Sequence, residues 1–95
     1  MNYQTKRDWV LAYLLEHKQA GTFDDTFHES WHREFGGRLI VYTMGPNRCP
    51  AAVRTLRRMW EDKEITRRVV GNQDARYYCQ PNWSIVYSLP YESAR

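Results

Sequence analysis

The 95-residue chain carries 14 Lys and Arg against 11 Asp and Glu, a formal net charge of +3, and 42% of its residues are hydrophobic. This composition excludes a disordered chain, and the length predicts a single domain over residues 1–95 with a modest core. No stretch approaches the roughly 18 apolar residues that a membrane-spanning helix needs. Two cysteines without a leader peptide predict a cytoplasmic protein with reduced thiols.

A first helix is expected over residues 5–18. Val10, Leu11 and Leu14 recur at the spacing of one helix face and predict its buried stripe. Trp9 falls toward the opposite side, where it either packs under a chain terminus or belongs to a self-association patch. The second interpretation, together with the limited affinity expected of so small a module, is the basis for expecting a possible homodimer.

A second helix is expected over residues 24–35. Phe27, Trp31 and Phe35 follow at i, i+4 and i+8, so that one aromatic edge faces the core. The glycine pair 36–37 ends this helix. The β-prone stretch 38–44 that follows predicts a short strand or an extended connection to the next helix.

The third helix, residues 50–63, is amphipathic and basic. Its apolar side chains gather on one side: Ala52, Val53, Leu56, Met59 and Trp60. Small and basic side chains lie opposite: Ala51, Arg54, Thr55 and Arg58. A helix with one core-facing side and one small, arginine-rich side is what entry into a DNA major groove requires.

A hairpin is expected at the end of the chain. The pattern alternates over the two strands, 65–70 and 83–89, with Pro90 closing the second. The connection, about residues 71–82, is longer than a minimal turn, which favours a functional role for this loop.

This order of elements, together with the run VRTLRRMWEDKEITRR from Val53 to Arg68, resembles the winged helix-turn-helix domains of small bacterial and phage proteins. The run fits the family's passage V-x-x-L-x-x-[ML]-x-x-x-x-x-[IL]-x-R from the recognition helix into the wing. In this chain Lys63 or Glu64 replaces the usual glycine before the first wing strand. The resemblance implies an α+β fold of three helices followed by a two-stranded wing.

The resemblance also implies a non-catalytic regulatory or transcription factor that binds double-stranded DNA without a cofactor. The helix residues expected to face the groove are Asn47, Arg48, Ala51, Arg54, Thr55 and Arg58. The wing residues expected to contact DNA, within 66–82, are Arg67, Arg68, Asn72, Gln73 and Arg76. Lys6 and Arg7 would add phosphate contacts. Arginine suits both guanine edges and phosphates, and the sequence leaves this choice open.

Two other hypotheses remain. The first is a winged-helix protein whose basic face binds a host or regulatory protein, since one fold serves many functions. The second is a minimal zinc hydrolase, because His28, Glu29 and His32 match H-E-x-x-H and would place two imidazoles on one helix face. Phe35 stands where the extended zinc motif has glycine, and the plainer interpretation places both histidines beside the aromatic core edge.

Overall fold

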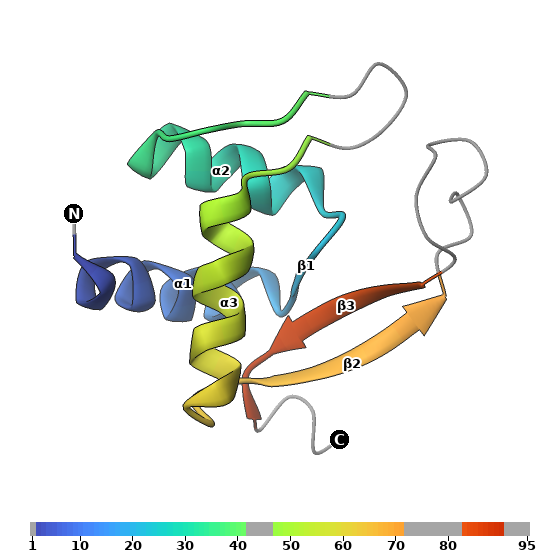
Figure 1. The fold of residues 1–95 in the computed structure, drawn as a ribbon. Coiled ribbons are helices and arrows are strands. Elements are labelled where there is room, and N and C mark those ends of the chain that lie inside the picture. The colour runs from blue at the N-terminus through green and yellow to red at the C-terminus, as the bar shows by residue number, and fades with distance from the viewer. Residues whose placement is uncertain (1, 42–46, 72–82, 91–95) are drawn as a thin grey trace.

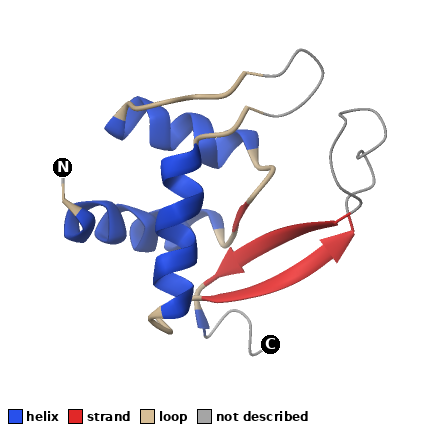
Figure 2. Cartoon of the chain, viewed as in Figure 1, coloured by secondary structure: helices blue, strands red, loops and turns tan. Residues whose placement is uncertain are grey.

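Three helices and a small antiparallel sheet make up the part of the chain that the structure, a computed structural model, describes: residues 2–41, 47–71 and 83–90. The elements follow in the order α1 (Tyr3–His17), β1 (Ala20–Gly21), α2 (Asp25–Phe35), α3 (Pro50–Glu61), β2 (Thr66–Gly71) and β3 (Trp83–Ser88). The sheet order is β1-β3-β2, and both pairings are antiparallel. The predicted α+β class is therefore confirmed (Figures 1 and 2).

The three predicted helices are present, and their ends lie within two residues of the expected bounds. Asn2 begins α1, because its side-chain oxygen accepts a hydrogen bond of 2.9 Å from the Thr5 amide. Asp24 begins α2 in the same way, with 3.2 Å to the Phe27 amide. Both helix starts thus have a side-chain cap that satisfies an amide left unpaired at the first turn.

The sheet has one strand more than the prediction. β1 was not expected, and it pairs Ala20 with Tyr87 and Gly21 with Val86 on the edge of β3. Of the two alternatives for residues 38–44, a short strand or an extended connection, residues 38–41 show no strand. There, Ile40 makes only an isolated antiparallel bridge with Arg48, and residues 42–46 lie outside the described part of the chain. This backbone pairing joins the two ends of the connection between α2 and α3, and it does not add a strand to the sheet.

In the turn after α3, a residue other than glycine adopts the left-handed backbone conformation. Lys63 has φ 63°, its amide donates to the Trp60 carbonyl at 3.0 Å, and the Glu64 amide donates to the Met59 carbonyl at 2.9 Å. These two bonds form a Schellman motif, which glycine normally supports at the left-handed position. Lys63 therefore occupies the place where the resemblance led us to expect glycine.

The core lies where the three helices meet the sheet, with α3 running across α1 in Figure 1. Among the described residues, those with little or no exposed surface come from every element except β2: Val10, Leu14, Ala20, Phe27, Trp31, Leu56, Met59 and Tyr87. Ile65 is buried just before β2, but Val69 is 68% exposed, so β2 itself is largely solvated on both faces. The β2–β3 hairpin extends away from the lower end of α3 (Figure 1).

Trp9 belongs to this core and not to an exposed patch. Its ring stacks on Tyr13 at 5.4 Å between centroids and packs edge-on against Trp31 at 5.8 Å and Phe35 at 5.6 Å. Aromatic pairs at these separations contribute more than their buried area alone. The self-association interpretation of Trp9 is therefore wrong, and a homodimer stays a prediction without this support.

No helix within the described ranges is both long and apolar enough to cross a lipid bilayer.

Candidate nucleic-acid interface

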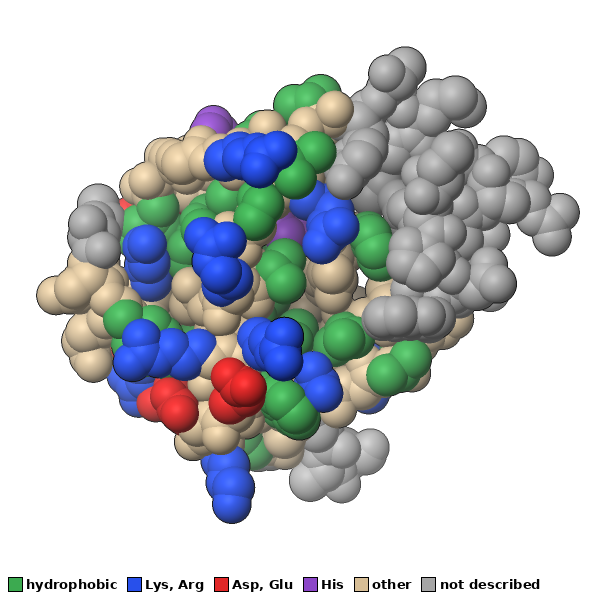
Figure 3. Space-filling view, viewed as in Figure 1, with side chains coloured by type: hydrophobic (Ala, Val, Ile, Leu, Met, Phe, Trp, Pro, Cys, Tyr) green, Lys and Arg blue, Asp and Glu red, His purple; other side chains and the backbone are tan. Residues whose placement is uncertain are grey.

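Positively charged side chains collect on the solvent side of α3. Arg54, Arg57 and Arg58 are exposed there, while Leu56 and Met59 on the other side are fully buried. Lys and Arg side chains spread across the face of the molecule on which α3 lies, and most of the acidic surface in this view lies in its lower part (Figure 3). The predicted division of this helix into a core side and a basic side is thus present.

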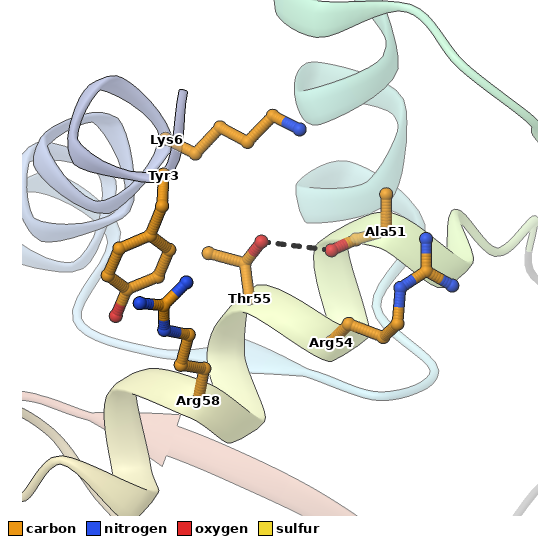
Figure 4. Close-up of a pocket in the computed structure, with 6 residues that line it drawn as sticks. All are labelled: Tyr3, Lys6, Ala51, Arg54, Thr55 and Arg58. Carbon is orange, nitrogen blue, oxygen red and sulfur yellow. Dashed lines mark hydrogen bonds between the residues drawn. The ribbon is translucent and has the colours of Figure 1, made fainter. Parts of the chain in front are cut away.

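A cavity of about 230 Å³, here named the α1–α3 cleft, opens between the first and third helices. Tyr3 and Lys6 of α1 line it together with four residues of α3: Ala51, Arg54, Thr55 and Arg58 (Figure 4). Three of these six side chains are cations, and none of the six is acidic. Such a cleft attracts anions, because nothing within its own described lining neutralises the charge.

Two members of the α1–α3 cleft are fixed by contacts inside the fold. The Arg58 guanidinium lies 3.6 Å from the centre of the Tyr3 ring, a cation–π contact that leaves its N–H donors free to point outward. The Tyr3 hydroxyl in turn donates to Glu64 at 3.5 Å. Burial, followed by the nearby charge of Glu64, raises the pKa of the Tyr3 hydroxyl, which therefore stays protonated.

Thr55 does not offer an exposed donor, although the sequence placed it on the groove-facing side. Its side chain is 7% exposed, and its hydroxyl donates to the Ala51 carbonyl at 3.0 Å. Thr55 and Ala51 thus form the small, closed floor of the cleft between the longer Arg54 and Arg58 side chains (Figure 4). Their size, rather than their hydrogen bonding, is what keeps the cleft open.

Lys6 and Arg7 are neighbours with different surroundings. The Arg7 guanidinium donates to the Glu64 carboxylate and, at 2.9 Å, to Asp8. The hydrogen bond to Glu64 is the main cause that raises the pKa of Arg7. The Lys6 ammonium, in contrast, has only a ring contact of 5.9 Å with Trp31 among the described residues. Of the two predicted phosphate contacts, Lys6 is available and Arg7 is already neutralised within the fold.

Asn47 and Arg48 are directed toward α2 rather than along the exposed side of α3. The Asn47 amide donates to Asp25, and its side chain donates to Glu29 at 3.4 Å. Arg48 is half-buried, with its guanidinium 5.1 Å from the centre of the Phe23 ring. The structure therefore separates these two residues from Arg54 and Arg58, with which the sequence had grouped them.

The hairpin contributes two of the predicted wing residues within its described part. Arg67 is exposed and stacks on Trp60 of α3 with 3.4 Å between guanidinium carbon and ring centre. Arg68, also exposed, donates to Gln19 at 3.1 Å. Asn72, Gln73 and Arg76 lie outside the described residues. The Arg67–Trp60 stack joins the basic side of α3 to the first strand of the hairpin.

His28, the first histidine of the H-E-x-x-H match, is a buried structural residue. Its Nε2–H lies 3.2 Å from the Gly21 carbonyl and 3.0 Å from the Thr22 carbonyl, while Nδ1 accepts from the Cys49 amide at 3.0 Å. We name this arrangement the His28 hub. The imidazole in this hub is the neutral form, because burial lowers the pKa of His28 from its usual value.

The hub removes His28 as a ligand for the zinc site of the sequence alternative. A metal needs a free ring nitrogen, and both nitrogens of His28 already bind backbone groups. Glu29 accepts from Asn47, and within the described ranges no three His, Cys, Asp or Glu residues are placed to hold one metal ion. The plainer interpretation of the sequence, which placed His28 beside the aromatic edge of α2, agrees with its burial.

No protein-family model, no curated protein and no solved structure matches this chain.

Proposed function

We propose that this chain is a non-catalytic DNA-binding protein of the winged-helix type, in which the basic side of α3 and the β2–β3 hairpin contact duplex DNA. The observation that carries this proposal is the α1–α3 cleft, which Lys6, Arg54 and Arg58 line without an acidic residue among the described lining. Three cations spread along one cleft without an acidic neighbour in its lining suit an external polyanion.

The arrangement of the elements supports the same proposal. The order α1-β1-α2-α3-β2-β3 agrees with a winged helix, in which the third helix reads the groove and the hairpin lies beside it. Arg67 of the hairpin, which stacks on Trp60, adds an exposed positive charge near α3. The proposed duplex would thus contact cations from two consecutive elements.

Each cation has a different part in this binding. Lys6, at the edge of the cleft on α1, suits a backbone phosphate, which it would hold as a point charge. Arg58, whose guanidinium carbon lies over the Tyr3 ring, suits a phosphate or the O6 and N7 atoms of guanine. Arg54 is exposed and has no ion pair or hydrogen bond with any described residue, so it is free to enter the groove. A role as a small bacterial or phage regulator in the cytoplasm follows from this proposal.

Replacing the two arginines tests it. Arg54→Ala and Arg58→Ala should each weaken binding to a preferred duplex by about 1–3 kcal/mol if the side chain reads a base. The matched control is Arg33→Ala, which removes an exposed arginine from α2, where it contacts only Ser30 among the described residues.

Fluorescence anisotropy with labelled duplex would measure the four affinities. Loss in the two α3 variants with near wild-type binding of the control supports the proposed interface. Equal affinity in all four proteins would reject the proposed DNA interface. It would favour the alternative that the basic side of α3 binds a protein partner.

A further inference from the structure

A second cavity, of about 320 Å³, opens on the other flank of α3, and we name it the α3–sheet cavity. Its apolar walls come from three places: the turn before α2 with Phe23, helix α3 with Val53, and strand β3 with Ile85 and Tyr87. A space of this size lies at the lower end of the range for small-molecule sites in proteins, roughly 300–1,000 Å³. It shares no lining residue with the α1–α3 cleft.

The walls of this cavity combine apolar surfaces with arginine. Phe23, Val53, Ile85 and Tyr87 supply an aromatic and aliphatic lining, against which a flat ring would bury its faces. Three arginines complete it, and one of them, Arg57, is already 3.8 Å from the Glu61 carboxylate. The other two, Arg48 and Arg67, have only ring contacts as partners for their guanidinium groups among the described residues.

Arg48 carries the clearest sign of a missing partner. Its Nε is buried and has no hydrogen-bond acceptor among the described residues. A buried donor without an acceptor costs about 1–3 kcal/mol, and such groups in folded proteins normally have a partner. The Phe23 ring holds the guanidinium in place but accepts no strong hydrogen bond. Arg48 as a whole is half-buried and lines the cavity, so an anionic group there would supply its guanidinium with a counter-charge.

We propose that the α3–sheet cavity binds a small planar aromatic carboxylate. The ring would lie between Phe23, Val53 and Ile85, and the carboxylate would accept from Arg48, with Arg67 as a second cation at the opening. A carboxylate can accept two parallel hydrogen bonds from one guanidinium group. An inorganic anion could accept them too, but it has no ring to bury against the apolar walls. Because the site lies between α3 and the hairpin, its occupant would contact both elements proposed to bind DNA.

The probe for this proposal is 2-naphthoate, with the uncharged 2-naphthylmethanol as the matched control of the same ring. Calorimetric titration of the full chain should give a dissociation constant for naphthoate at least roughly tenfold lower than for the alcohol. Amide resonances of Phe23, Val53 and Ile85 should shift on titration. Absence of naphthoate binding at millimolar concentration, equal binding of both compounds, or shifts confined to other elements would each overturn the proposal.

Two variants locate the site. Arg48→Met removes the charge and keeps the length of the side chain, and Val53→Phe fills the space next to the ring position. Each should weaken naphthoate binding by at least roughly tenfold. Unchanged naphthoate binding in either folded variant would contradict the site. Arg54→Ala, which lies in the other cleft, should lose DNA affinity and keep naphthoate binding, so failure of one proposal is distinguishable from failure of the other.

Discussion

The His28 hub and the α1–α3 cleft both gather polar groups from distant parts of the chain, and they use them in opposite ways. In the hub, both ring nitrogens of His28 are hydrogen-bonded to backbone groups of Gly21, Thr22 and Cys49, and the histidine has no exposed surface. In the cleft, Lys6, Arg54 and Arg58 come together without an acidic side chain in the described lining. The first arrangement is complete within the fold, and the second is not.

The difference shows which polar residues to assign to function. Burying a polar group is costly unless it is hydrogen-bonded, so a satisfied buried group such as His28 is there to hold the structure. A cluster of like charges opposes folding slightly, and the fold here leaves it without internal compensation. A binding function gives such a cluster a reason to exist. The following predictions separate the two regions by changing one and leaving the other intact.

Removing His28 should have the largest effect. His28→Ala leaves the Cys49 amide and the two carbonyls without their partner and opens a cavity in the core, so the free energy of unfolding should fall by about 3–5 kcal/mol. Urea unfolding monitored by circular dichroism measures it. His32→Ala serves as the control, because His32 is only half-buried and its Nδ1 has no hydrogen-bond partner among the described residues. Equal losses in the two variants would contradict the hub.

A single cation of the cleft should change DNA binding without changing the fold. Lys6→Ala should weaken binding uniformly across duplex sequences and reduce the slope of log affinity against log salt by about 1. The control is Arg33→Ala, which removes one exposed positive charge from α2, outside the lining of the cleft. A salt slope unaltered by Lys6→Ala, or reduced equally by the control, would remove Lys6 from the interface.

Lowering the pH should weaken the hub. Since burial holds the pKa of His28 below its ordinary value of about 6.5, the unfolded chain binds the extra proton first as the pH falls. The contribution of His28 to stability is complete above that value, and it is lost progressively below it. His28→Gln, which retains a donor and an acceptor but does not titrate, should show a shallower decline of unfolding free energy between neutral pH and about pH 5. Parallel declines would argue against a buried neutral imidazole.

The smallest expected effect concerns the turn that leads from α3 into the hairpin. Lys63→Gly should raise the free energy of unfolding by about 0.5–1 kcal/mol, because glycine adopts the positive φ of 63° without steric cost. Lys63→Ala keeps the side-chain clash and should give no gain. Thermal unfolding of the two variants compares them directly, and a gain in the alanine variant would show that the lysine side chain, not its backbone, is unfavourable.

The sequence predicted α3 well because the two sides of a helix are defined by the spacing of residues close together in the chain. The alternation of Leu56 and Met59 with Arg54 and Arg58 is enough to define a buried side and a basic side, and the structure has both. β1 was not predictable in the same way, since its two residues are too few for a period and its strand character comes from pairing with β3. Lys63 likewise takes a conformation that its residue type does not favour, because the two hydrogen bonds of the turn fix it.

The site was predicted less well, because its decisive contacts join distant residues. Lys6 and Arg7 look equivalent in the sequence, and only the position of Glu64 beside Arg7 distinguishes them. The role of His28 depends on backbone atoms, which carry no residue-specific signal. Arg48 was grouped with the groove-facing arginines by its nearness in sequence, but it packs on Phe23. Sequence spacing indicates which side of a helix a residue occupies, and it does not identify the partner.

The most direct test of the proposed function is the affinity of the wild-type chain for a pool of random duplex DNA, measured across a series of salt concentrations. The proposal predicts tight binding at low salt that weakens linearly on a log–log plot, with a slope of about −0.9 for each phosphate neutralised. An enriched sequence among the bound duplexes would add base reading to these phosphate contacts. Absence of binding even at the lowest salt concentration would contradict the assignment of the α1–α3 cleft to DNA.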